Sequence, residues 1–202
     1  MEYLDLKERG LTGYRLAMSG TVENKDRKLF DEKSVLILRE AIYDCSWLLS
    51  RGYNEHSALT LVGNRFQVNK RQRHALRRAT CSEQGRDRRR SNRLKSYELP
   101  TCAHIDGLNI LITLERAATG RLLIRCADGV IRDLAGVHGA YQSISITPMI
   151  IDMVTKALNE LGVVKQLWFL DRPVSNSLRL SKLLSEHNCQ VEVVNNPDRI
   201  IA

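Results

Sequence analysis

Apolar residues recur at helical spacing in the first 80 positions of the chain. One such face begins after Asp31, a suitable N-cap, and consists of Val35, Leu38, Ile42, Cys45 and Leu49. A second helix is predicted after Asn54. A third is predicted from Asn69 onward, because Asn69 and Gln72 have the spacing of a capping box. The N-terminal part of the chain therefore predicts a small all-α domain.

The pattern changes at residue 102, where short apolar runs begin to alternate with helical segments. Runs of strand length occupy residues 102–106, 122–126, 130–134 and 190–194, and another ends at Leu170. Asp128-Gly129 between two of these runs predicts a hairpin turn. The alternation of the other runs with helical patterns predicts an α/β domain with a mostly parallel sheet.

Positive charge is concentrated in one segment. The formal net charge is +8, but residues 65–95 hold twelve Lys or Arg against two acids, whereas residues 103–202 hold ten of each. Residues 82–96 also lack apolar periodicity. We therefore expect three parts: a helical, basic, helix-turn-helix-like domain over residues 1–81, a basic linker over 82–101, and an α/β domain over 102–202.

The third predicted helix carries much of this charge. Two short helices joined by a glycine-containing turn, the second strongly basic, are typical of a helix-turn-helix. A localised basic surface attracts a phosphate backbone, so nucleic acid is the predicted partner. The candidate contacts are Lys70, Arg71, Arg73, Arg77 and Arg78. The alternative is a solvated helix face followed by a charged linker.

Composition excludes several classes of protein. No apolar stretch approaches the roughly 20 residues that cross a bilayer, and the N-terminus lacks the apolar core of a signal peptide. The five cysteines are scattered without a C-x-x-C pair, which disfavours a zinc knuckle or a thioredoxin-type site and fits reduced thiols. We expect a cytoplasmic protein with no membrane partner; its oligomeric state stays open, a homodimer included.

Acidic residues follow the apolar runs of the α/β part. Asp106 and Asp171 each come directly after a predicted strand, and Asp198 follows the last run. The carboxyl ends of parallel strands open onto one crevice, and converging carboxylates are the ligands that Mg²⁺ or Mn²⁺ requires. We therefore predict that Asp106 and Asp171 are catalytic metal ligands, with Asp198 as a third. The alternative is that each Asp only caps the helix that follows it.

Five polar residues near these acids are candidates for binding a substrate: Asn109, His138, Arg172, Ser175 and Asn176. The last three precede a helical pattern, and a helix N-terminus suits a phosphate group. His138 lies in a glycine-flanked loop and is a candidate general base or phosphate contact. The alternative for Asn176 is plain N-capping of the following helix.

Distinctive stretches occur in both parts of the chain. The helical part contains Leu48-Leu49-Ser50-Arg51-Gly52-Tyr53 and the segment 57–65, and the α/β part contains Ile105-Asp106-Gly107-Leu108-Asn109-Ile110-Leu111 and the segments 132–139 and 170–177. In these stretches the chain resembles an uncharacterised prokaryotic, mainly archaeal, family of unknown function that pairs a small helical domain with an α/β domain. This resemblance brings little information about function.

A second resemblance rests on Asp106-Gly107-x-Asn109 at the end of the first strand, which is similar to the opening of PIN/NYN-type ribonuclease domains. It implies a PIN/Rossmann-like fold and a first-strand Asp that holds Mg²⁺ or Mn²⁺ together with acids from later strand ends. The chain departs from the PIN pattern because it lacks a further acid on a later Ser/Thr-x-Asp segment. Asp198, Asp152 and Glu115 are candidate substitutes.

We therefore expect a metal-dependent, ribonuclease-like phosphodiesterase that acts on RNA rather than DNA, with Mg²⁺ or Mn²⁺ as its cofactor. The alternative is a non-catalytic nucleic-acid-binding or regulatory protein whose α/β domain is degenerate or binds a nucleotide. Fold alone does not separate these functions, so the arrangement of Asp106, Asp171 and a third acid is the discriminating feature.

Overall fold

The computed structural model of the chain describes residues 24–94, 100–134, 141 and 143–201. Its N-terminal part contains α1 (Asn24–Leu29), α2 (Glu32–Ser50), α3 (Glu55–Arg65), α4 (Lys70–Ala79) and α5 (Glu83–Ser91). The α/β part contains β1 (Cys102–Asp106), α6 (Gly107–Ala118), β2 (Leu123–Arg125), β3 (Ile131–Asp133), α7 (Thr147–Glu160), β4 (Lys165–Asp171), α8 (Ser177–Glu186), β5 (Gln190–Val194) and α9 (Asp198–Ile201).

The helices of the N-terminal part begin where their caps were predicted. The side chain of Asp31 accepts a hydrogen bond from Ser34 N at the start of α2, and Asn69 and Gln72 form the capping box of α4. Apolar residues of α2, α3 and α4 then form one buried cluster that includes Ala41, Cys45, Leu48, Ala58, Val62 and Leu76. The predicted all-α character of this part is confirmed.

The sheet that organises the α/β part is parallel, as predicted. Its strand order is β1-β4-β5, with β4 in the centre, whereas β2 and β3 form a separate antiparallel hairpin. Ile105, Trp168 and Leu170 of the sheet pack in one buried cluster with apolar residues of α6, α7 and α8. The helices thereby fix the direction of the three strands, so that their carboxyl ends lie at the same edge.

Gly107 allows the close approach of α6 to the centre of the sheet. A Cβ at this position would lie 2.8 Å from Leu170 Cδ2 and 3.3 Å from the backbone oxygen of Phe169. Both neighbours are buried, so they have little room to move. The glycine that follows Asp106 therefore brings the start of α6 directly against β4.

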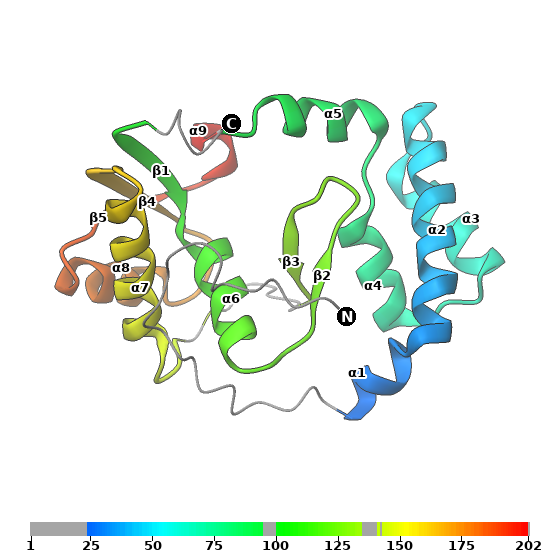
Figure 1. Ribbon diagram of the computed structural model, residues 1–202, viewed down its shortest axis with the longest axis horizontal. Helices are drawn as coiled ribbons and strands as arrows, with labels where there is room; N and C mark the ends of the chain where they lie inside the picture. The colour runs from blue at the N-terminus through cyan, green and yellow to red at the C-terminus, as the bar shows by residue number, and fades with distance from the viewer. Residues whose placement is uncertain (1–23, 95–99, 135–140, 142, 202) are drawn as a thin grey trace.

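Helix α5 lies within the segment predicted to be a basic linker, and this is a departure from the sequence-based expectation. Ser82 caps α5, Glu83 N donates to Ser50 Oγ at 2.9 Å, and Arg89 Nε lies 2.7 Å from Asp128 Oδ2. Figure 1 shows α5 running along the top of the molecule between the helical group and the sheet. No residue of α5 is buried, so the helix has no apolar core contact of its own. The contacts with Ser50 and Asp128 therefore hold it in place.

The hairpin β2–β3 joins the two parts of the chain. It contacts α6 on one side and α4 on the other. The backbone N–H of Ala127 also donates to the carbonyl of Ala79, at the end of α4, at 2.8 Å. In Figure 1 the hairpin lies between the helical group and the sheet, and the helical part is therefore docked on the α/β part.

Candidate functional site

The three predicted acids follow three neighbouring strands. In the register of the sheet Asp106 is opposite Phe169, so that Asp171 lies two residues further along β4 and is itself opposite Val194. Asp198 begins α9 after β5, and α9 contacts β1. Asp106, Asp171 and Asp198 therefore gather at the carboxyl edge of the sheet, where ligands bind in open α/β folds.

Asp106 is also the N-cap of α6. Its Oδ1 accepts a hydrogen bond from Asn109 N at 3.1 Å, and its Oδ2 accepts one from Asn109 Nδ2 at 2.6 Å. The capping role that the sequence left open is thus real, and Asn109 fixes the orientation of the carboxylate. Each carboxylate oxygen has a second lone pair, so capping does not prevent Asp106 from binding a cation.

The pKa of the Asp171 carboxyl group is affected by its acidic neighbours. Burial raises the pKa of its carboxyl group, and the negative charges of Asp106 and Asp198 raise it further. Repulsion of this kind is relieved by a proton or by a bound cation. Of the three substitutes considered for the third acid, Asp198 is the one whose charge acts on Asp171.

The other two substitutes have different partners. Asp152 lies on α7 and meets His187 Nδ1 at 2.6 Å. Glu115 is buried in α6, where its Oε1 accepts hydrogen bonds from Tyr141 Oη at 2.6 Å and from Thr147 Oγ1 at 2.5 Å. These contacts hold α6, α7 and the segment before α7 together, a role that no sequence motif indicated.

The three acids do not form a closed metal cage. Among the residues that the structure describes, no group of three or more His, Cys, Asp or Glu side chains lies close enough to hold a metal ion. The charges of Asp106 and Asp198 nevertheless both act on Asp171, so the three carboxylates repel one another.

The residues between β4 and α8 surround a cavity of about 480 Å³ lined in part by Arg172, Ser175 and Asn176. Asn176 is the N-cap residue of α8, with a φ of 69°, but its side chain makes no capping hydrogen bond and instead donates from Nδ2 to the carbonyl of Tyr141 at 2.9 Å. Arg172 Nη2 donates to the carbonyl of Val193 at 3.1 Å. The predicted substrate contacts thus line one cavity, apart from Asn109; His138 lies outside the described residues.

The five basic residues predicted to contact nucleic acid point to different faces of α4. Arg71 binds both carboxylate oxygens of Asp26 and donates from Nη1 to the carbonyl of Leu134 at 2.6 Å. Arg78 donates from Nη2 to Asp133 at 3.2 Å, and the Asp133 side chain is 5% exposed. Arg71 and Arg78, seven residues apart, therefore dock α4 on α1 and on the end of β3.

Arg73 lies across α3. Its Nε donates to the carbonyl of Val68 at 3.0 Å and its Nη2 to Asn64 Oδ1 at 2.8 Å. A Cβ at Gly63 would clash with its guanidinium, so the glycine provides the space that this side chain occupies. Lys70 and Arg77 line a cavity between α1, α3 and α4, whose lining also includes parts of Arg71 and Arg73.

No sequence pattern indicated the buried ion-pair cluster around Asp128, a residue that was assigned only to the hairpin turn. Asp128 accepts hydrogen bonds from both terminal nitrogens of Arg132, at 2.9 and 2.8 Å, and from Val130 N. Arg89 of α5 lies against the same carboxylate. The spacing of Asp128 and Arg132 is compatible with this pair, but Arg89 is brought in only by the tertiary fold.

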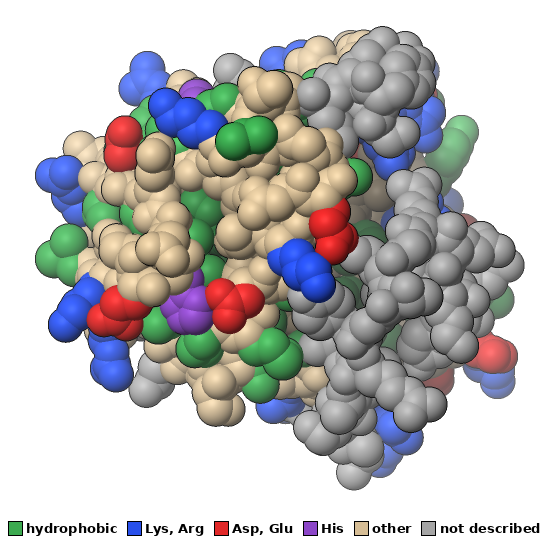
Figure 2. Space-filling model, turned by 60° about the vertical axis from the view of Figure 1, so that its left-hand side comes forward, with side chains coloured by type: hydrophobic (Ala, Val, Ile, Leu, Met, Phe, Trp, Pro, Cys, Tyr) green, Lys and Arg blue, Asp and Glu red, His purple; other side chains and the backbone are tan. Residues whose placement is uncertain are grey.

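Charge is distributed more evenly over the α/β part than over the basic segment 65–95. Figure 2 shows this side of the molecule, on which the coloured Lys and Arg side chains lie singly around the face and Asp and Glu side chains lie among them. This agrees with the balanced charge of residues 103–202.

No helix within the described ranges is long and apolar enough to span a bilayer.

Comparisons with known proteins match both parts of the chain. Residues 99–202 match the family described as a domain of unknown function (DUF5616), and residues 37–92 match the family described as a protein of unknown function (DUF434). An uncharacterized protein of Methanocaldococcus jannaschii, MJ0935, is 30% identical over 151 residues, which are 74% of this chain and 72% of that protein. No solved structure matches. The resemblance to an uncharacterised family is confirmed.

Proposed function

For this chain, which belongs to the family of unknown function DUF5616, we propose metal-dependent cleavage of phosphodiester bonds in RNA at the carboxyl edge of the sheet. The observation that carries the proposal is the position of Asp106 and Asp171 at the carboxyl ends of two adjacent parallel strands, with Asp198 at the start of α9 after the third strand. The charges of Asp106 and Asp198 both act on Asp171. Three carboxylates at one strand edge favour a divalent cation and a substrate whose own charge needs that cation. A PIN-like arrangement of the domain is part of this proposal.

Each residue has a specific task in the proposed reaction. Asn109 holds the Asp106 carboxylate in place through two hydrogen bonds. Asp171 and Asp198 supply further anionic oxygens, and Arg172 and Ser175 line the neighbouring cavity, where a phosphate group would lie near the N-terminus of α8. Bound Mg²⁺ or Mn²⁺ would supply Lewis acidity and a water of lowered pKa.

The test uses the full chain with Mn²⁺ and a labelled RNA oligonucleotide. Asp106→Asn keeps a cap for α6 but removes a charge that a hard cation needs, so it should abolish cleavage and weaken Mn²⁺ binding measured by calorimetry. Glu160→Gln is the matched control, because Glu160 is an exposed acid on α7 whose contact with Lys156 is long, at 3.9 Å. An Asp106→Asn protein that cleaves as well as the parent would refute the proposal.

A second candidate is a nucleic-acid-binding or regulatory protein without catalysis. It is favoured by the observation that both Asp106 oxygens already accept hydrogen bonds from Asn109. In that case the acids serve to start α6 and α9. RNA binding by the parent protein, with neither cleavage nor Mn²⁺ binding, would select this candidate.

A further inference from the structure

Six of the twelve Lys and Arg residues between positions 65 and 95 form ion pairs with carboxylates within the fold. The ion pairs are Arg65–Asp44, Arg71–Asp26, Arg77–Glu55, Arg78–Asp133, Arg86–Asp87 and Arg89–Asp128. Within the described part of the chain, Lys70 and Arg73 of α4 form no ion pair with a carboxylate, and neither do Arg88, Arg90 and Arg93 further along. What distinguishes Lys70 and Arg73 is their position. Both line the same cavity.

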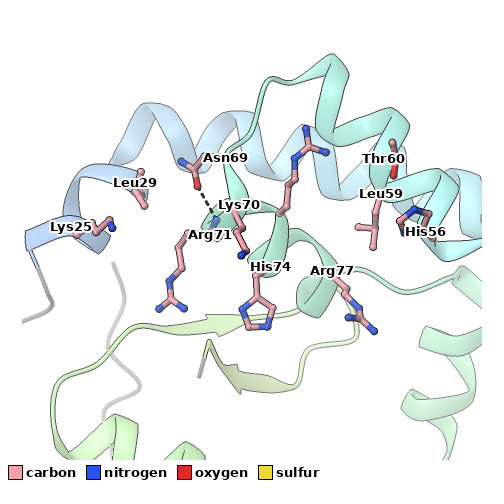
Figure 3. Close-up of a pocket in the computed structure, with 11 residues that line it drawn as sticks. Lys25, Leu29, His56, Leu59, Thr60, Asn69, Lys70, Arg71, His74 and Arg77 are labelled. Atoms are coloured by element: carbon pink, nitrogen blue, oxygen red, sulfur yellow. Dashed lines mark hydrogen bonds between the residues drawn. The ribbon is translucent and has the colours of Figure 1, made fainter. Parts of the chain in front are cut away.

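This cavity has a volume of about 780 Å³ and lies between α1, α3 and α4. Lys25 of α1 contributes another cation, and the described residues that line the cavity include no Asp or Glu. Lys70, His74 and Arg77 recur at intervals of four and three residues, and Figure 3 shows them on one side of α4 together with Arg71. The cavity is therefore a concave site of positive potential.

The cavity also has an apolar part. Leu29 of α1 and Leu59 of α3 line it, and the imidazole ring of His56 lies beside Leu59 and Thr60 in Figure 3. Cavities of about 300–1,000 Å³ with an apolar lining and a few polar groups are typical of small-molecule sites. A ligand that fills it would have an anionic end for α4 and a flat, weakly polar body for the leucines.

We infer that this cavity binds a nucleoside phosphate, with the phosphate on Lys70 and Arg77 and the base against Leu59. The ion pair between Arg77 and Glu55 does not prevent this, since it spans 3.6 Å and both side chains are more than half exposed, at 63% and 55%. A phosphate oxygen offers Arg77 a charge-assisted hydrogen bond in exchange.

The shape of the site favours one nucleotide over a long stretch of backbone. A backbone track would need a continuous row of available cations, but Arg78 at the end of α4 and Arg89 of α5 meet the buried carboxylates Asp133 and Asp128. The nucleotide can come from two sources: a free nucleoside monophosphate or the phosphorylated end of an RNA strand. Binding of a nucleotide from either source does not depend on RNA cleavage at the carboxyl edge of the sheet.

The experiment measures binding to the full chain without added metal. AMP, adenosine and inorganic phosphate are titrated by calorimetry, and RNA oligonucleotides with a 5′-phosphate or a 5′-hydroxyl are compared by fluorescence polarisation. We expect AMP or the 5′-phosphorylated RNA to bind at least roughly tenfold more tightly than its counterpart without phosphate, because the phosphate adds charge-assisted hydrogen bonds to Lys70 and Arg77. Preference for free AMP identifies the free nucleotide as the source, and preference for the RNA identifies the strand end.

Thr60→Trp tests the cavity itself, because Thr60 is exposed at its edge and a large ring there fills space without changing charge. It should weaken binding roughly tenfold. Leu61→Trp is the matched control: Leu61 is the next residue, is 59% exposed and lines a different cavity. Lys70→Gln should also weaken binding, whereas Arg88→Gln on exposed α5 removes the same charge and should not.

Two results would overturn the inference. One is equal affinity for the ligands with and without phosphate, including no binding of either. The other is Thr60→Trp protein that binds as tightly as the Leu61→Trp control. Loss of cleavage in Asp106→Asn with nucleotide binding retained leaves the inference standing, so failure at the acidic edge and failure at this cavity are distinguishable.

Discussion

Replacement of Asp128 by Asn should weaken the attachment of α5 and α4 to the hairpin. The Asp128 side chain is 1% exposed, and its carboxylate is held by Arg132, Val130 N and Arg89. The contact with Arg89 acts through charge, since Arg89 Nε is buried without hydrogen-bond geometry to a partner. One carboxylate therefore binds two guanidinium groups from different parts of the chain.

The size of the effect follows from the pKa. Burial by itself would raise the pKa of Asp128, but the hydrogen bonds from Arg132 and Val130 and the charges of Arg132 and Arg89 outweigh it and lower the pKa from 3.8 to about 2. At about 1.36 kcal/mol per pKa unit, the ionised group contributes roughly 2.5 kcal/mol to the free energy of unfolding. Because the folded-state pKa is the lower one, this stability is complete above about pH 4 and disappears as the pH falls toward 2.

Asp128→Asn should therefore lower the free energy of unfolding by about 2–3 kcal/mol at pH 7. This is less than the loss for a fully buried pair, because the Arg132 and Arg89 side chains are 28% and 38% exposed and keep part of their hydration. Urea unfolding at pH 7 and at pH 2.5 provides the measurement, with the difference between variant and parent shrinking at the lower pH. Asp87→Asn is the control, since its side chain is 63% exposed and should cost below about 1 kcal/mol. Equal unfolding midpoints for Asp128→Asn and the parent at pH 7 would refute the reasoning.

Three further changes test other contacts. Gly107→Ala should cost about 1–3 kcal/mol in urea unfolding, because its Cβ meets the buried Leu170 and the Phe169 carbonyl; an unchanged midpoint would show that α6 can shift. Tyr141→Phe should cost about 1–2 kcal/mol, since Glu115 loses one of its two hydroxyl donors, and Leu178→Ala at an exposed site of α8 is its control. Asp171→Asn should raise the melting temperature at pH 7 without metal, because the raised pKa of Asp171 means that its ionised form is unfavourable in the folded state. The same substitution should remove any stabilisation by Mn²⁺. A lower melting temperature of the metal-free variant would contradict this.

The sequence predicted the regular elements whose signals are local. The stripe of α2, the capping box at Asn69 and the apolar run 102–106 each depend on neighbours within a few residues, and the structure has a helix or strand at each place. The parallel direction of β1, β4 and β5 was also predictable, because helices separate them along the chain. Helix α5 was not, since Glu83–Ser91 has no buried residue and is held by Ser50 and Asp128, which are distant in sequence.

The strand ends that carry the candidate acids were predictable, but the contacts of the candidate residues were not. Asp106 and Asp171 end two adjacent strands, whereas among the described residues no three acids, histidines or cysteines lie close enough to hold a metal ion. The number of basic residues in a sequence, however, does not reveal which carboxylates they pair with in the fold. Arg71 and Arg78 looked equivalent to Lys70 in the sequence, yet they face carboxylates at Asp26 and Asp133 that lie 45 and 55 residues away.

The hairpin β2–β3 has a consequence for any attempt to study the helical half alone. Asp128 and Asp133 belong to the α/β half but act as counter-ions for Arg89 and Arg78 of the helical half. In a fragment of the helical half alone, those guanidinium groups would have lost their counter-ions. The fragment would bind any polyanion, and its affinity would fall steeply with salt concentration. Affinity for nucleic acid measured on such a fragment would report on the severed surface, so the intact chain is the material on which the specificity of this protein has to be judged.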